Sequence, residues 1–273
     1  MSDGRITQVV AVTAAVAGAI VLATLLFDPL PAESGWWVAF GTLYLLSIFS
    51  VALSIRITSG GATSSMDFIP CLAATVLLGP SGATLLALGL GIWSVYQWFF
   101  ESQAVKKAVF NTAQVTAATG AAGWTFTLTG GSPSFTALGF PGSLLPFFAA
   151  VIVYFGINTT AVSLVVAEEQ GSPFTTTWSN LAGRLIGFDV FVSPVAYGVA
   201  YLDIAYGHVT LLLALVPLYG LRYTYGANLE LQNLNTDLLR TMMRVMESQD
   251  PYTSGHSVRV AQYSQALAEE LGV

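Results

Sequence analysis

ITQVVAVTAAVAGAIVLATLLF, residues 6–27, contains no charged side chain and is long enough to cross a bilayer, which takes about 20 apolar residues in a helix. The run is followed by Asp28-Pro29-Leu30-Pro31 rather than by a small-residue cleavage site, so we interpret it as a retained membrane span and not a secretory signal. Further long apolar runs lie at 36–55, 82–100, 108–128, 143–166, 185–205 and 208–222.

A shorter apolar run, 66–79, is closed by the breaker Gly79-Pro80-Ser81-Gly82. Its length suits either a full crossing or a re-entrant segment that forms a broken hairpin with its successor, and both alternatives stay open. The sequence therefore predicts an all-α polytopic membrane bundle with about eight membrane segments.

Positive charges predict the orientation of these segments. With eight alternating crossings, Arg5, Arg56, Lys106-Lys107, Arg184 and Arg222 all fall on one side. The loops 28–35 and 129–142 and the turn around Gly207 contain no Lys or Arg. Because Lys and Arg concentrate in cytoplasmic loops, we expect both termini in the cytoplasm.

Composition excludes an ordinary soluble domain. Hydrophobic residues make up 54% of the 273 positions and charged residues 9%, against roughly 25% charged in soluble domains. The net charge of -6 and the lack of a basic cluster larger than Lys106-Lys107 argue against a nucleic-acid partner. The lipid bilayer is the expected partner of residues 1–222, which form the predicted multi-spanning domain.

Polar residues inside the predicted spans define a candidate ligand pocket. Asp189 lies at the centre of the run 185–205, and Arg184, five residues earlier, is a possible partner for its carboxylate. Asn111, Gln114 and Asn158 could contribute further polar groups. The alternative is that these side chains only hydrogen-bond one helix to another.

The chain becomes more polar after Arg222. Leu231, Leu234, Leu238, Thr241 and Val245 follow the 3-4 spacing of a coiled-coil seam with one polar member. Residues 223–249 are therefore predicted to form a cytoplasmic signalling helix that continues from the last span and pairs in a parallel homodimer. The alternative is an amphipathic helix packed on its own domain.

A proline break at Asp250-Pro251 separates this helix from the string Tyr252-Thr253-x-Gly255-His256-Ser257-x-Arg259-Val260 and a further amphipathic helix ending in AEELGV. With Glu247 upstream, residues 247–273 resemble the opening of HD-GYP domains, the bacterial cyclic di-GMP phosphodiesterases. The runs FNTAQ at 110–114 and LLGP at 77–80 are similar to membrane sensor modules attached to such domains.

The resemblance implies that 250–273 begin a phosphodiesterase domain in which His256 would bind one ion of a divalent metal pair of iron, manganese or zinc. Cyclic di-GMP would be the substrate of the complete domain. The HD pair and the GYP loop are absent from these 273 residues, so no catalytic residue, bound metal or hydrolysis is expected here.

Three functional hypotheses follow. The first is a membrane sensor that controls a cytoplasmic phosphodiesterase through a dimeric helix. The second is a small-solute transporter, suggested by the broken segment at 66–82 and the polar pocket. The third is a non-catalytic subunit of a membrane assembly.

Overall fold

The computed structural model describes residues 2–52, 55–56, 63–64, 67–100, 105–137, 139–208, 211–249 and 256–271. The chain divides into two compact units, Met1–Tyr219 and Gly220–Val273. The helices are α1 Ser2–Phe27, α2 Ser34–Ala52, α3 Phe68–Phe100, α4 Val105–Leu128, α5 Leu144–Gln170, α6 Phe174–Val192, α7 Pro194–Tyr206, α8 Leu211–Gln249 and α9 His256–Leu271. Two short strands, β1 Ile55–Arg56 and β2 Thr63–Ser64, pair antiparallel. The predicted helical fold is confirmed.

Four of the described helices are long and apolar enough to cross a membrane. They cover Gly4–Phe27, Ser34–Val51, Phe68–Ile92 and Leu144–Gln170, and Val190–Tyr206 is a shorter apolar stretch. The number of crossings and the sides of the two termini remain predictions.

The structure corrects the single span predicted at 185–205. The chain there forms two helices that meet at Ser193, since α6 ends at Val192 and α7 begins at Pro194. Proline has no N–H to donate and its ring clashes with the carbonyl four residues earlier, so it ends one helix and starts the next. The hydroxyl of Ser193 donates to the carbonyl of Val190 at 2.8 Å and so satisfies one carbonyl at the end of α6. Helix α6 also begins at Phe174, well before the predicted start.

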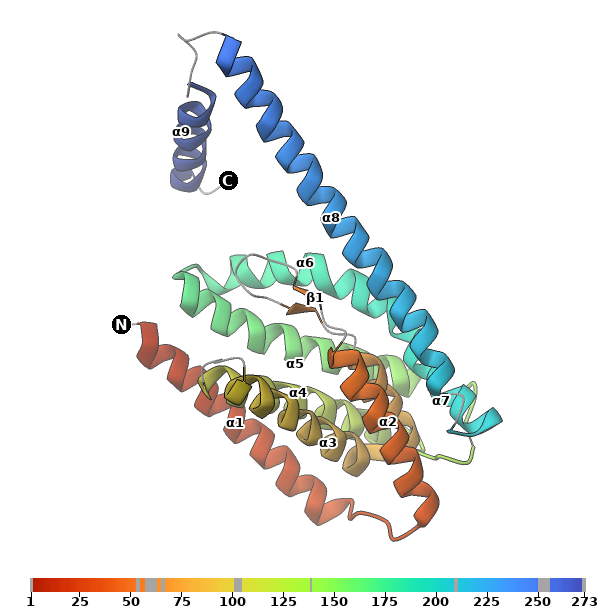
Figure 1. Ribbon diagram of the computed structural model, residues 1–273. Helices are drawn as coiled ribbons and strands as arrows, with labels where there is room; N and C mark the ends of the chain where they lie inside the picture. Colours follow the sequence, from red (N-terminus) through yellow and green to blue (C-terminus); the bar gives the residue numbers. More distant parts are fainter. Residues whose placement is uncertain are drawn as a thin grey trace. The chain divides into compact units, whose positions relative to one another are not determined.

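Helix α3 is the central helix of the bundle. In its apolar stretch 89% of the residues are buried, whereas in that of α1 11% are buried. It packs against α2, α4 and α7, while α4 lies between α1, α3 and α5 (Figure 1). Glycine permits the close approach of α4 to α3, because a Cβ on Gly123 would lie 2.9 Å from the Cα of Pro80. The tight contact falls at the point where α3 is broken.

Candidate functional site

Gly79 breaks α3 into two halves. Its backbone has φ 73° and ψ -167°, a conformation that essentially only glycine adopts. Pro80 follows at the first position of the second half, where its missing N–H costs nothing. The first half, Phe68–Leu78, is buried throughout and about 17 Å long at 1.5 Å per residue. This is shorter than the hydrocarbon core, which is about 30 Å thick, so a full crossing and a re-entrant segment both remain open.

Asp28 caps the second half of α3 from a distant part of the chain. The backbone N–H of Ser81 donates to Oδ2 of Asp28 at 2.8 Å. A carboxylate suits this place, because the free N–H groups and the dipole of a helix start favour negative charge. The loop after α1 is thereby joined to the break in α3.

A third segment closes over the break. The N–H of Ser134 donates to the carbonyl of Val76 at 3.2 Å. The ring of Pro133 lies so near that a Cβ on Gly79 would be 3.2 Å from its Cγ. The two loops predicted to lie on one side because they lack Lys and Arg, 28–35 and 129–142, therefore meet at the same point of α3.

A cavity of about 520 Å³ lies among these three segments, a volume within the range of small-molecule sites. Aromatic and proline side chains dominate its lining, and Asp28 is the one ionisable residue among the described residues that form it. The lining residues are Phe27, Asp28, Pro29, Pro31, Trp36, Leu77, Leu78, Gly79, Pro80, Ser81, Trp124, Thr127, Pro133, Ser134 and Phe135.

The two tryptophans of the cavity are held in place. Trp36 is 4% exposed, and its ring stacks on Phe40 with centroids 5.8 Å apart and planes 4° from parallel. The indole N–H of Trp124 donates to Oγ1 of Thr24 at 3.1 Å, and that hydroxyl donates in turn to the carbonyl of Ile20 at 2.8 Å. Rings that are already fixed lower the entropy lost when a ligand binds against them.

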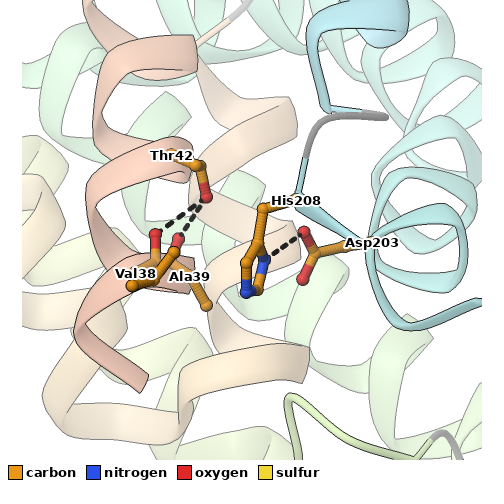
Figure 2. A network of polar contacts seen from close by, with 5 residues as sticks. All are labelled: Val38, Ala39, Thr42, Asp203 and His208. Atoms are coloured by element: carbon orange, nitrogen blue, oxygen red, sulfur yellow. Dashed lines mark hydrogen bonds and ion pairs between the residues drawn. The ribbon is translucent and has the colours of Figure 1, made fainter. Parts of the chain in front are cut away.

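A second polar feature lies at the end of α7. Nδ1 of His208 is 2.9 Å from Oδ1 of Asp203, whose side chain is 1% exposed (Figure 2). The distance is that of a hydrogen bond between the two side chains. Oδ2 of Asp203 is buried and has no hydrogen-bond partner among the described residues.

The predicted pocket residues lie on three neighbouring helices. Asn111 and Gln114 belong to α4, Asn158 to α5, and Arg184 and Asp189 to α6. Within the described part of the chain no hydrogen bond joins two of these residues, and Oε1 of Gln114 is buried without a partner. The side chains of Arg184 and Asp189 fall outside the described residues, so their pairing stays a prediction.

The other predicted site residues lie on α8 and α9. His256 is the first residue of α9, and its side chain falls outside the described residues. Leu231, Leu234, Leu238 and Val245 lie on α8, and their side chains are 53–61% exposed. Such exposure leaves Leu231, Leu234 and Leu238 available to a second helix.

Sequence reasoning missed the cavity. The breaker Gly79-Pro80-Ser81-Gly82 suggested a transporter and Asp28-Pro29 marked the end of a span, but the sequence did not predict that the two lie at one cavity. The sequence did hold a clue to the cavity: with eight alternating crossings, the breaker and the two loops without Lys or Arg are all predicted on the same side of the membrane.

The apolar helices are those of a membrane protein, and the cavity at the break in α3 has a volume in the range of small-molecule sites. A sequence model of MASE9, a membrane-associated sensory domain family, matches residues 34–230. The chain belongs to the MASE9 family. No curated protein and no solved structure shows a significant similarity to it.

The family match corrects the assignment to HD-GYP proteins. The family identified is MASE9, and no similarity found links the chain to HD-GYP proteins. The metal pair and the cyclic di-GMP partner rested on that resemblance alone. The membrane and sensory parts of the interpretation agree with the family.

Proposed function

We propose that the chain is the sensory module of a bacterial inner-membrane signalling protein, and that α8 carries the state of the bundle to the cytoplasm. The MASE9 match supports the sensory role. The supporting observation for the output path is α8 itself, which continues without interruption for 39 residues. At 1.5 Å per residue it is about 58 Å long, nearly twice the hydrocarbon thickness of a bilayer.

The output is proposed to act through a parallel homodimer. Leu231, Leu234 and Leu238 follow coiled-coil spacing and are each more than half exposed in the single chain. Exposed leucines at such positions are stabilised by packing into the holes of a partner helix. A ligand that favours one arrangement of the bundle would then change the pairing of α8, by as much as its affinities for the two arrangements differ.

Cysteine cross-linking in native membranes tests this function. In a Cys71→Ala background, Leu231→Cys, Leu234→Cys and Leu238→Cys should each form disulfide-linked dimers under mild oxidation. Thr236→Cys is the matched control, because Thr236 is exposed on α8 but lies on the opposite face of the heptad. Equal cross-linking at all four positions, or none at any, would refute a paired seam.

The sides of the bilayer on which the two termini lie can be measured by labelling intact and opened cells. Cysteines placed at Ser2 and Thr236 should both react with membrane-impermeant maleimide only after the cells are opened. Labelling of either position in intact cells would contradict the proposed orientation.

A second candidate function is the transport of a small solute. The observation that favours it is the break in α3 at Gly79, because transporters bind substrates at discontinuous helices. Proteoliposomes separate the two functions, since a carrier accumulates a labelled solute over time whereas a sensor only binds it to saturation.

A further inference from the structure

We propose that the cavity at the break in α3 binds a small organic cation, an amine or quaternary ammonium ion on an apolar body. This inference rests on the proposed function, because it takes the cavity as the input site of the sensor.

Charge selects the class of ligand. Asp28 is the one ionisable residue in the described lining, and no Lys, Arg or His accompanies it. One oxygen of the carboxylate, Oδ2, accepts from Ser81. No described protein group donates to the other oxygen, so it remains available to a ligand. An anion would face this carboxylate without a basic side chain to offset the repulsion.

The aromatic lining favours the same class. Phe27, Trp36, Trp124 and Phe135 contribute to the wall. The faces of such rings attract cations, and sets of them around a carboxylate are suited to quaternary ammonium groups. Trp36 and Trp124 are already fixed by Phe40 and Thr24, so little reorganisation opposes binding.

The same carboxylate couples the ligand to the helix. Asp28 neutralises the positive start of the second half of α3 through Ser81. A cation beside Asp28 would interact with the same carboxylate that stabilises the start of this helix. Pro133 lies against Gly79 and Phe135 against Gly35, where added Cβ atoms would be 3.2 Å and 3.1 Å away. Occupation of the cavity therefore acts on α2, on both halves of α3 and on the loop 133–135.

The test is calorimetric titration of the full chain in nanodiscs made only of phosphatidylglycerol, which carries no ammonium headgroup. Choline is the probe, 3,3-dimethylbutan-1-ol is its uncharged isostere, and acetate is the anion control. We expect choline to bind at least about tenfold more tightly than the alcohol, and acetate not to bind. Equal affinities for choline and the alcohol, or binding of acetate, would overturn the proposal.

Asp28→Asn is the decisive variant, because the amide oxygen can still accept from Ser81 while the charge is lost. Its choline affinity should fall at least about tenfold. Glu33→Gln is the matched control, since Glu33 lies in the same loop but does not line the cavity. Unchanged affinity in Asp28→Asn would overturn the proposal.

A second pair of variants covers the case in which Asp28→Asn does not fold. Phe135→Leu removes one aromatic face from the loop and should weaken choline severalfold. Phe140→Leu is its control, because Phe140 is 66% exposed in the same connection and does not line the cavity. Equal affinities of these two variants would count against the aromatic wall and overturn the proposal.

Two further measurements separate the sources of the cation and the levels of the hypothesis. Weaker choline binding in nanodiscs that contain phosphatidylethanolamine would support the cation site and identify the lipid headgroup as its occupant. Unchanged binding there would support a soluble cation. If choline binds but does not change cross-linking at Leu234→Cys, the cation site is supported and signalling through α8 is refuted. If Leu234→Cys cross-links but choline does not bind, the paired α8 helices are supported and the cation site is refuted.

Discussion

Nδ1 of His208 lies 2.9 Å from Oδ1 of Asp203, while Oδ2 of the same carboxylate is buried without a partner among the described residues (Figure 2). Among the described residues, the imidazole is therefore the one side-chain hydrogen-bond partner of a carboxyl group that is 1% exposed. A buried carboxylate is tolerated only when its charge is compensated.

We expect His208→Ala to destabilise the bundle by about 1–3 kcal/mol, because it leaves both oxygens of Asp203 unsatisfied. Asp203→Asn in the His208→Ala background should restore part of this loss by removing the buried charge. Unfolding of the full chain in detergent micelles measures both effects. A double variant no more stable than His208→Ala would show that the two residues are not coupled.

Gly79→Ala should destabilise the chain by about 1–3 kcal/mol, because its backbone conformation is one that alanine rarely adopts. The added Cβ would also lie 3.2 Å from Pro133 Cγ and 3.7 Å from Oδ2 of Asp28. Gly156→Ala on α5 is the matched control, since among the described residues no atom beyond the adjoining helix backbone lies within 4 Å of its added Cβ. Equal unfolding midpoints for the two variants would contradict the strained break.

Thr24→Val should cost about 1–3 kcal/mol, because it removes the acceptor of the Trp124 indole N–H and leaves that part-buried donor without its partner. Thr13→Val on the same helix is the control. Its hydroxyl likewise donates to the carbonyl four residues earlier, Val9, at 2.8 Å, but no tryptophan depends on it. The fluorescence of Trp124 should shift only in Thr24→Val, which can be read with the other tryptophans replaced by phenylalanine.

Apolar runs predicted most of the bundle because a membrane helix is marked by uninterrupted hydrophobicity. The runs at 6–27 and 108–128 end at the same residues as α1 and α4. The break at Gly79 was also predictable, since Gly-Pro interrupts a helix by local chemistry alone. The start of α6 was missed, because Phe174–Asn180 contains three threonines, a serine and an asparagine and lacks an apolar run.

The cavity could not be predicted in the same way. Asp28, Ser81 and Ser134 come together only through tertiary contacts between segments that are far apart in the chain. The assignment to HD-GYP proteins was wrong for a related reason. The resemblance rested on a short string, residues 247–273, whereas the MASE9 match extends over residues 34–230.

Leu238→Asp should abolish dimers of the full chain, because it would place a charge in the apolar seam of the proposed α8 pair. Met243→Asp is the matched control, since Met243 is 46% exposed on the same helix but lies on the opposite face of the heptad. Light scattering of the purified chain in detergent reports the mass of the protein component. We expect the wild type and Met243→Asp to be dimeric and Leu238→Asp monomeric. A dimeric Leu238→Asp would show that the subunits associate through the membrane bundle and not through α8.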